Sequence, residues 1–133
     1  MLRVRKVFLL LSSLLVMMGL AGCANQNAGS PAAEAIDAYL DALVQKEENQ
    51  MINLACAEWE SQAKLEFDSF AAVKVTLEGP GCTEAMQDGS IILVTCSGKI
   101  IASYGEEDLI IELKDRKYQV VIEDGEWRMC GYR

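Results

Sequence analysis

The chain ends in YQVVIEDGEWRMCGYR (Tyr118–Arg133), the stretch that decides the fold. Asp124-Gly125 is a strong signal for a two-residue β-hairpin turn, because these residue types tolerate the positive φ angles that such turns require. A turn of that length places Trp127 opposite Ile122 on the neighbouring strand. The sequence therefore predicts two antiparallel strands joined by this turn.

Upstream segments have the same strand character. Residues 73–78 alternate apolar and polar side chains, and Gly79-Pro80-Gly81 is expected to end that strand. After a turn signal at residues 87–90, residues 91–104 are typical of one long strand.

In the third expected strand, the set of residues that point toward the core changes partway along. Its inward candidates are odd-numbered in residues 109–113 but even-numbered in residues 118–122. Because the side-chain period of a strand is two, the change requires a bulge, a bend or a break across residues 114–117. With the final strand, the sequence predicts a four-stranded antiparallel sheet in chain order.

Two helices are expected before the sheet. Ser30 is typical of an N-cap and Pro31 of a first helical position, so a helix is predicted to begin there. The apolar residues that follow have the spacing of one buried stripe: Ile36, Tyr39, Leu40, Leu43 and Val44. A second helix is predicted over residues 49–68. Tyr39 is expected to cover the core with its hydroxyl in water.

This element order predicts an α+β domain over residues 31–133, in which two helices pack on a curved sheet. The early helix AIDAYLDALVQ and the closing YQVVIEDGEWRMCGY resemble the nuclear transport factor two-like, cystatin-like cone fold. The resemblance implies a domain of a kind shared by enzymes, binding modules and assembly domains, so it implies no single function.

The N-terminal segment has the layout of an export signal. A basic start is followed by an aliphatic run over residues 7–20, which is short for a permanent membrane span. The run ends in Leu20-Ala21-Gly22-Cys23, which resembles the lipobox of bacterial lipoproteins. That resemblance implies cleavage between Gly22 and Cys23 and lipid on Cys23. Residues 1–22 are thus expected to be a signal peptide, although an uncleaved membrane anchor is the alternative.

The expected mature chain is strongly acidic. Of 12 basic residues, Arg3, Arg5 and Lys6 leave with the signal, so 9 remain against 20 acidic residues, a net charge of −11. Such a charge excludes nucleic acid as an expected partner and leaves the lipid on Cys23 as the contact with the membrane. Residues 23–30 form the lipidated cysteine and its tether. The expected location is extracytoplasmic, at the outer membrane if the bacterium has two membranes.

Four cysteines remain in the expected domain: Cys56, Cys82, Cys96 and Cys130. An even number in an exported chain predicts two disulfides. The alternative, a four-cysteine zinc site, would need closely spaced pairs that the sequence lacks. No metal and no cofactor are expected.

The pairing is predicted from the strand order. Cys82 and Cys96 flank the turn at residues 87–90 and come nearly opposite each other, so they are expected to pair. Cys96 and Cys130 lie two strands apart in a meander, roughly 9–10 Å, beyond the reach of a disulfide. By elimination, Cys56 is expected to form a disulfide with Cys130. If Trp127 faces inward, the alternative is Cys56–Cys82 with Cys96–Cys130, in a different strand order.

Catalytic signals are weak. The chain has no histidine, which removes the Ser-His-Asp and Cys-His arrangements, and it has no glycine-rich phosphate loop. Trp59, Phe70 and Trp127 are expected either to pack in the core or to line an apolar pocket at the mouth of the cone.

These observations favour a non-enzymatic binding or protein-interaction domain, expected to hold an apolar small molecule or a protein partner, or to pair with a second copy through its sheet face. The alternative is an enzyme of isomerase or dehydratase type. That alternative requires an Asp or Glu buried inside the cone beside a Tyr, with a raised pKa.

Overall fold

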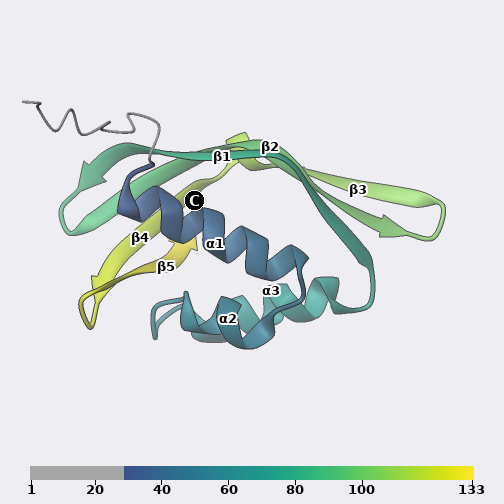
Figure 1. Cartoon of the computed structure of the whole chain (residues 1–133), viewed down its shortest axis with the longest axis horizontal. Coiled ribbons are helices and arrows are strands. Elements are labelled where there is room, and N and C mark those ends of the chain that lie inside the picture. Colours follow the sequence, from purple (N-terminus) through teal and green to yellow (C-terminus); the bar gives the residue numbers. More distant parts are fainter. Residues whose placement is uncertain (1–28) are drawn as a thin grey trace, which may run out of the picture.

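The structure, a computed structural model, describes residues 29–133 and arranges them as three helices followed by a curved antiparallel sheet (Figure 1). The expected signal peptide, its cleavage site and Cys23 lie outside the described residues. The elements are α1 (Pro31–Val44), α2 (Glu48–Asn53), α3 (Glu60–Ala71), β1 (Lys74–Asp88), β2 (Ile91–Tyr104), β3 (Glu107–Glu112), the 3₁₀ turn η1 (Leu113–Asp115), β4 (Lys117–Glu123) and β5 (Glu126–Tyr132).

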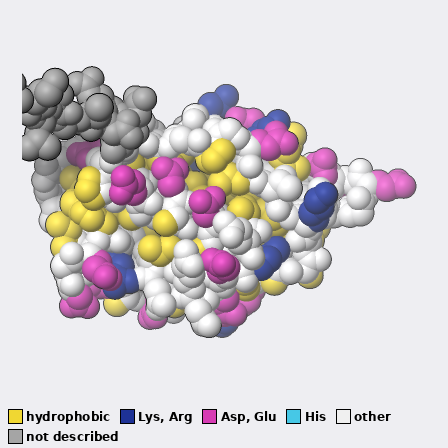
Figure 2. All heavy atoms as spheres, in the orientation of Figure 1, with side chains coloured by type: hydrophobic (Ala, Val, Ile, Leu, Met, Phe, Trp, Pro, Cys, Tyr) yellow, Lys and Arg dark blue, Asp and Glu magenta, His cyan; other side chains and the backbone are white. Residues whose placement is uncertain are grey.

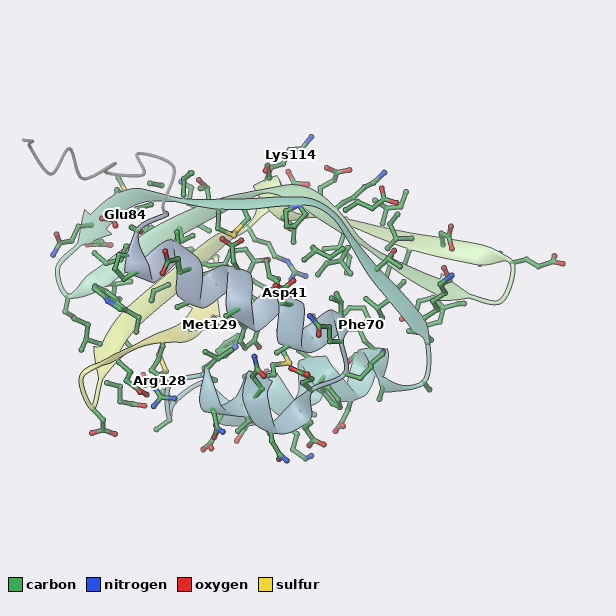
Figure 3. All side chains as sticks on the ribbon, in the orientation of Figure 1. Asp41, Phe70, Glu84, Lys114, Arg128 and Met129 are labelled. Atoms are coloured by element: carbon green, nitrogen blue, oxygen red, sulfur yellow. A yellow bond between two sulfur atoms is a disulfide. The ribbon has the colours of Figure 1, made fainter. Side chains whose placement is uncertain are left out.

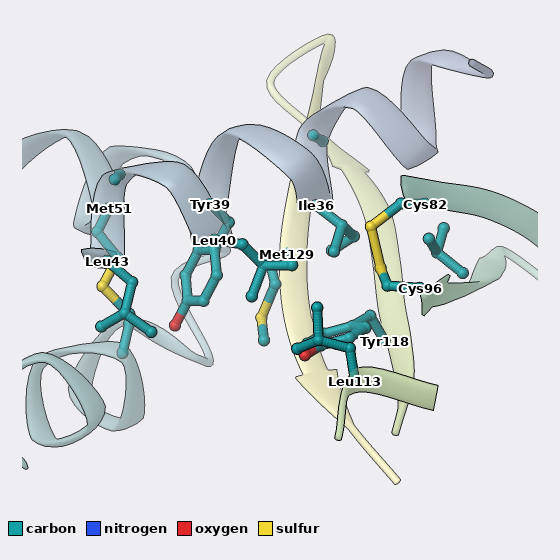
Figure 4. Close-up of a cluster of buried hydrophobic side chains, with 14 of the residues drawn as sticks. Ile36, Tyr39, Leu40, Leu43, Met51, Cys82, Cys96, Leu113, Tyr118 and Met129 are labelled. Atoms are coloured by element: carbon teal, nitrogen blue, oxygen red, sulfur yellow. A yellow bond between two sulfur atoms is a disulfide. The ribbon is translucent and has the colours of Figure 1, made fainter. Parts of the chain in front are cut away.

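The first helix begins and is buried as its sequence predicts. The Ser30 hydroxyl accepts a hydrogen bond from the backbone N–H of Ala33 at 3.2 Å, and Pro31 opens the helix. The side chains of Ile36 and Leu43 are fully buried in the core. Figure 4 shows α1 facing Tyr118 and Met129 of the last two strands across this core.

The sheet is a meander whose third strand is interrupted. Strands lie in the order β1-β2-β4-β5, and β3 also pairs with β2. β3 pairs with residues 99–104 of β2, and β4 pairs with residues 92–95 further along. The expected change of facing is confirmed, because η1 separates the two strands with Leu113 fully buried. The sheet therefore has five strands rather than four.

The final hairpin has the expected register. Ile122 pairs with Trp127, and both turn residues, Asp124 and Gly125, have positive φ angles of 53° and 79°. This is the geometry that a two-residue turn requires. Figure 3 shows Met129 of β5 beneath α1, whereas Lys114 points away from the helices.

The prediction of one helix over residues 49–68 is wrong, because the chain leaves helical geometry between α2 and α3 to pair with the sheet. The Met129 N–H donates to the Leu54 carbonyl, and the Cys56 N–H donates to the Met129 carbonyl, both at 2.8 Å. Ala55 thus forms a parallel bridge with Met129 at the outer edge of β5. These long-range hydrogen bonds replace the helical ones.

The prediction that Gly79-Pro80-Gly81 ends the first strand is also wrong. β1 continues to Asp88, and the register shifts between Glu78 and Gly81 where a bulge absorbs the proline. Gly98 of β2 lies against this bulge with φ 89°, and a Cβ there would approach the Glu78 carbonyl oxygen to 2.3 Å. Only glycine fits at that position.

The two disulfides are Cys82–Cys96 and Cys56–Cys130, the pairs favoured by the sequence. Cys82 and Cys96 are direct partners across β1 and β2. Cys56 reaches Cys130 because Ala55 pairs with Met129 in parallel, so the next residues are neighbours. This edge contact removes the conflict with Trp127, since Cys130 need not face the helices to meet Cys56.

Residues 103–110, at the β2–β3 hairpin, extend beyond the helices and are called the arm below (Figure 1). Tyr104, Leu109 and Ile110 are 47%, 48% and 52% exposed there. In the space-filling view the arm narrows to a tip that carries acidic side chains (Figure 2).

Candidate functional site

A pocket of about 270 Å³ lies between α3 and the C-terminal part of the sheet. Its apolar wall comes mainly from aromatic rings, and its polar wall from an ion pair and two neutral side chains. The lining residues are Trp59, Gln62, Leu65, Glu66, Ser69, Phe70, Arg116 and Tyr132. The pocket therefore places opposite charges beside flat apolar surfaces.

Glu66 is the acidic group of the pocket. Its carboxylate accepts a hydrogen bond from the Tyr39 hydroxyl at 2.9 Å and forms an ion pair with Arg116 at 3.3 Å. The side chain of Glu66 is 12% exposed. Burial raises the pKa of the Glu66 carboxyl, although the hydrogen bond from Tyr39 and the charge of Arg116 act in the opposite direction.

Tyr39 supports Glu66 from the core side. The prediction that its hydroxyl lies in water is wrong, because Tyr39 is fully buried and its hydroxyl donates to Glu66. Burial and the neighbouring Glu66 charge raise the pKa of Tyr39 far above its ordinary value. The hydroxyl therefore stays protonated and remains a hydrogen-bond donor to Glu66.

Arg116 is held by aromatic rings as well as by Glu66. Its guanidinium carbon lies 4.3 Å from the centre of the Tyr132 ring, within the range of a cation–π interaction. Tyr132 in turn contacts the edge or face of two further rings, Trp59 at 5.6 Å and Tyr118 at 5.9 Å between centroids. These contacts restrict the guanidinium to the pocket wall.

Gly131 allows this aromatic packing. It has φ 114°, and a Cβ at this position would lie 3.4 Å from the ring of Trp59. Two buried polar atoms nearby, the Trp59 indole nitrogen and the Tyr118 hydroxyl oxygen, have no hydrogen-bond partner within residues 29–133.

Two of the three expected pocket residues line this site. Trp59 and Phe70 belong to its wall, and Figure 3 places Phe70 near the C-terminal end of α1. Trp127 does not line it. Its half-buried side chain lies opposite Ile122 near the tip of the β4–β5 hairpin and packs against the edge of the core.

Glu66 and Arg116 were not predicted as site residues. They are 50 positions apart, and their contact depends on the turn η1, which delivers Arg116 next to α3. One signal was present: Glu66 lies on the stripe of α3 that also holds Ala63 and Phe70, both buried. A carboxylate on a buried stripe needs a cation or hydrogen-bond donors beside it. The sequence does not specify which residues supply them to Glu66.

A second, smaller pocket of about 160 Å³ lies beside the α2–α3 connection. The Glu123 carboxylate accepts there from the Ala57 backbone N–H at 3.0 Å. Within the described part of the chain, no group of His, Cys, Asp or Glu is arranged to hold a metal ion. No helix in residues 29–133 is long and apolar enough to cross a membrane.

Comparison with known proteins identifies likeness in structure alone. No family model matches the sequence, and no curated protein sequence matches it. A SEC-C motif containing protein from Rhodopseudomonas palustris superposes with a TM-score of 0.52 at 12% identity, over 78% of this chain and 80% of that one.

Two further structures are similar at lower scores. An LEH-like epoxide hydrolase from M. tuberculosis has a TM-score of 0.48 at 15% identity, over 79% of this chain and 84% of that one. The helical cell shape determining protein from Campylobacter jejuni has a TM-score of 0.49 at 10% identity, over 74% and 38%. Because both TM-scores are below 0.5, these two likenesses carry no argument about the fold.

The fold class is as the sequence predicts. Within residues 29–133, three helices pack on a curved antiparallel sheet of five strands, which is an α+β arrangement.

Proposed function

We propose that the protein is a lipid-anchored binding domain outside the cytoplasm, and that its pocket holds a small molecule with a flat apolar body and a hydrogen-bond-accepting head group. One observation carries the ligand chemistry: the pocket joins the rings of Trp59 and Tyr132 to the guanidinium of Arg116. Pockets that combine apolar walls with a few fixed polar groups are typical ligand sites.

The head group is inferred from the donors that Arg116 offers. A guanidinium has five N–H donors; Arg116 donates one of them to the Glu66 carboxylate at 3.3 Å and lies beside the Tyr118 hydroxyl. The remaining donors suit a carbonyl or carboxylate oxygen. The volume of about 270 Å³ is close to the lower limit of ligand pockets, so the ligand is small.

The location is inferred from the N-terminal sequence and the disulfides. Leu20-Ala21-Gly22-Cys23 resembles a lipobox, and acyl chains on Cys23 would anchor the chain to a membrane. Two disulfides in the domain are consistent with an oxidising compartment.

The anchor is tested by changing Cys23. We expect Cys23→Ser to abolish metabolic labelling with a radioactive fatty acid and to leave the precursor uncleaved. Ala24→Ser, one residue further on, is the control and should label normally. Continued labelling of Cys23→Ser would contradict the assignment.

Ligand binding is tested through the fluorescence of Trp59. The chain has 2 tryptophans, so Trp127→Phe leaves Trp59 as the single reporter in the pocket. We expect a panel of small aromatic carboxylic acids to change its emission in a saturable way. Arg116→Lys keeps the charge but loses the planar fork, and should weaken binding about tenfold.

Arg133→Lys is the matched control, because Arg133 forms an exposed ion pair with Asp88 outside the pocket. It should leave the affinity unchanged. If no acid changes the emission, and native mass spectrometry of the protein in mild detergent finds no co-purified small molecule, the binding proposal is wrong.

A second candidate function, catalysis of isomerase or dehydratase type, has one specific observation in its favour. Glu66 is a carboxylate with a side chain only 12% exposed, beside a tyrosine and with a raised pKa, on the wall of the pocket. Such a group can act as a general acid or base. Binding is the better supported function, because both carboxylate oxygens of Glu66 already accept from Tyr39 and Arg116.

The two functions differ in how Glu66→Gln behaves. In an enzyme, the amide cannot transfer the proton, so turnover of a bound compound should fall at least about a hundredfold. Binding of the same compound should change only slightly. In a binding domain, the unchanged protein should turn over none of the compounds that it binds.

A further inference from the structure

The sheet has three outer edges, and they differ in how they are protected. The edge of β5 is covered by Leu54–Cys56, which pairs with Met129. The edge of β1 is interrupted by the bulge that contains Pro80. β3 has neither protection: within residues 29–133 it pairs with β2 alone, in an unbroken register from Glu107 to Glu112. Its outer edge therefore presents free backbone donors and acceptors.

The side chains at this edge are apolar and uncovered. Leu109 and Tyr104 lie on the face that is continuous with the buried side of the sheet, because their cross-strand partners are Ala102 and Glu107 and inward residues alternate along each strand. Both are nearly half exposed, and Ile110 on the opposite face is 52% exposed. The arm thus has apolar side chains on both faces, and no helix of residues 29–133 packs against either face.

Charge at the arm decides which partner suits it. Glu106, Glu107 and Asp108 form no ion pair within the described part of the chain. If β3 paired with a second copy of itself about Ile110, Asp108 would lie opposite Glu112. Like charges directly opposite each other are destabilising, so the acidic residues disfavour self-association.

We propose that the outer edge of β3 is a docking site for an extended segment of a partner protein in which basic and apolar residues alternate. The segment adds a strand to the sheet, its apolar side chains pack on Leu109, and its basic side chains meet Asp108 on the opposite face of β3. Strand addition of this kind combines backbone hydrogen bonds with side-chain selection at alternate positions. The site is separate from the pocket, so its test does not depend on ligand binding.

The probe is a fluorescent peptide of alternating lysine and valine, and the comparison peptide has glutamate in place of lysine. The full chain in mild detergent is titrated at low and at high salt, with fluorescence anisotropy as readout. We expect saturable binding of the lysine peptide, weakened by salt, and none of the glutamate peptide. Hydrogen exchange should slow at residues 107–112 when the lysine peptide is bound.

Leu109→Ser should weaken binding of the lysine peptide about tenfold. Ile122→Ser is the matched control, because Ile122 is 60% exposed at the tip of the other hairpin and remote from β3. Ile122→Ser should bind the lysine peptide with the same affinity as the unchanged protein.

Four outcomes would overturn the proposal. The first is equal binding of both peptides, the second is slowed exchange away from β3, and the third is an equal loss in the Ile122→Ser control. A dimer of the protein that Leu109→Ser dissociates would also overturn it, since the occupant would then be a second copy.

Discussion

The sheet has two parts: one is covered by the helices, and the other is the arm. Both parts use the same residue types, but these are buried in the first part and exposed in the second. Along the inward side of β2, Ile100 and Ala102 are fully buried, whereas Tyr104 is 47% exposed. The same change occurs on β3, where Ile111 is half-buried and Leu109 is 48% exposed. The strand pairing is regular throughout.

The difference teaches that strand pairing does not decide burial in this molecule. Both parts have cross-strand apolar pairs, but only the covered part has helices on its concave face (Figure 1). Burying an isoleucine side chain stabilises a fold by about 1.5–3 kcal/mol. The arm forgoes that contribution, which is why its exposed residues call for another explanation, such as a partner.

The largest expected effect concerns the disulfides, both of which lie outside the arm. Replacing Cys56 and Cys130 together by alanine opens a loop with a sequence separation of 74 and should lower the free energy of unfolding by about 4 kcal/mol. Replacing Cys82 and Cys96, separated by 14, should lower it by about 3 kcal/mol. Urea unfolding of the double variants measures both.

Proteolysis would sharpen that comparison. Neither change should alter the cleavage rate within residues 103–110, because no disulfide is attached to the arm. A faster cleavage there, at unchanged conditions, would mean that the two parts of the sheet are coupled.

The next effect compares isoleucines of the two parts directly. Ile100→Ala removes a fully buried side chain and should lower the free energy of unfolding by about 3 kcal/mol. Ile110→Ala, on the paired strand of the arm, should change it by less than about 0.5 kcal/mol. Urea unfolding measures both variants. If both lose a similar amount of unfolding free energy, burial under the helices does not distinguish the two parts of the sheet.

The smallest expected effect is the pH dependence that Glu66 contributes in the covered part. Burial raises the folded-state pKa of Glu66, so the folded protein binds a proton more readily than the unfolded chain. Stability from this group therefore falls as the pH rises from the unfolded pKa, near 4.5, through the raised folded pKa.

Glu66→Gln should remove this component. The unfolding free energy of the variant should decline less than that of the unchanged protein between pH 4.5 and neutrality. Glu48→Gln, at the exposed ion pair with Lys64, is the control and should follow the unchanged protein. If Glu66→Gln declines as steeply as the control, Glu66 is not held in a desolvated environment.

Much of the fold could be predicted because its signals are local. The start of α1 depends on Ser30 and Pro31, and the last hairpin on Asp124-Gly125, and each acts within a few residues. The break between β3 and β4 was visible as a change of facing, since alternation is a property of neighbouring positions.

The errors arose where distant segments compete with local preference. Leu54–Cys56 has helical character in isolation, but the free edge of β5 offers backbone hydrogen bonds to Met129 that a continuous helix would forgo. Likewise, Pro80 did not end β1, because β2 continues alongside it and the bulge accommodates the proline. Neither outcome is encoded in the segment itself.

The candidate site shows the same division most clearly. The sequence alone determined the expected lipobox, the number of cysteines, the absence of histidine and the aromatic character of Trp59 and Phe70. Only the tertiary structure decided that Glu66 meets Tyr39 and Arg116, at separations of 27 and 50 positions. The physical reason is that residue type and local spacing are written in the chain, whereas desolvation and ion pairing depend on which segments the packed core brings together.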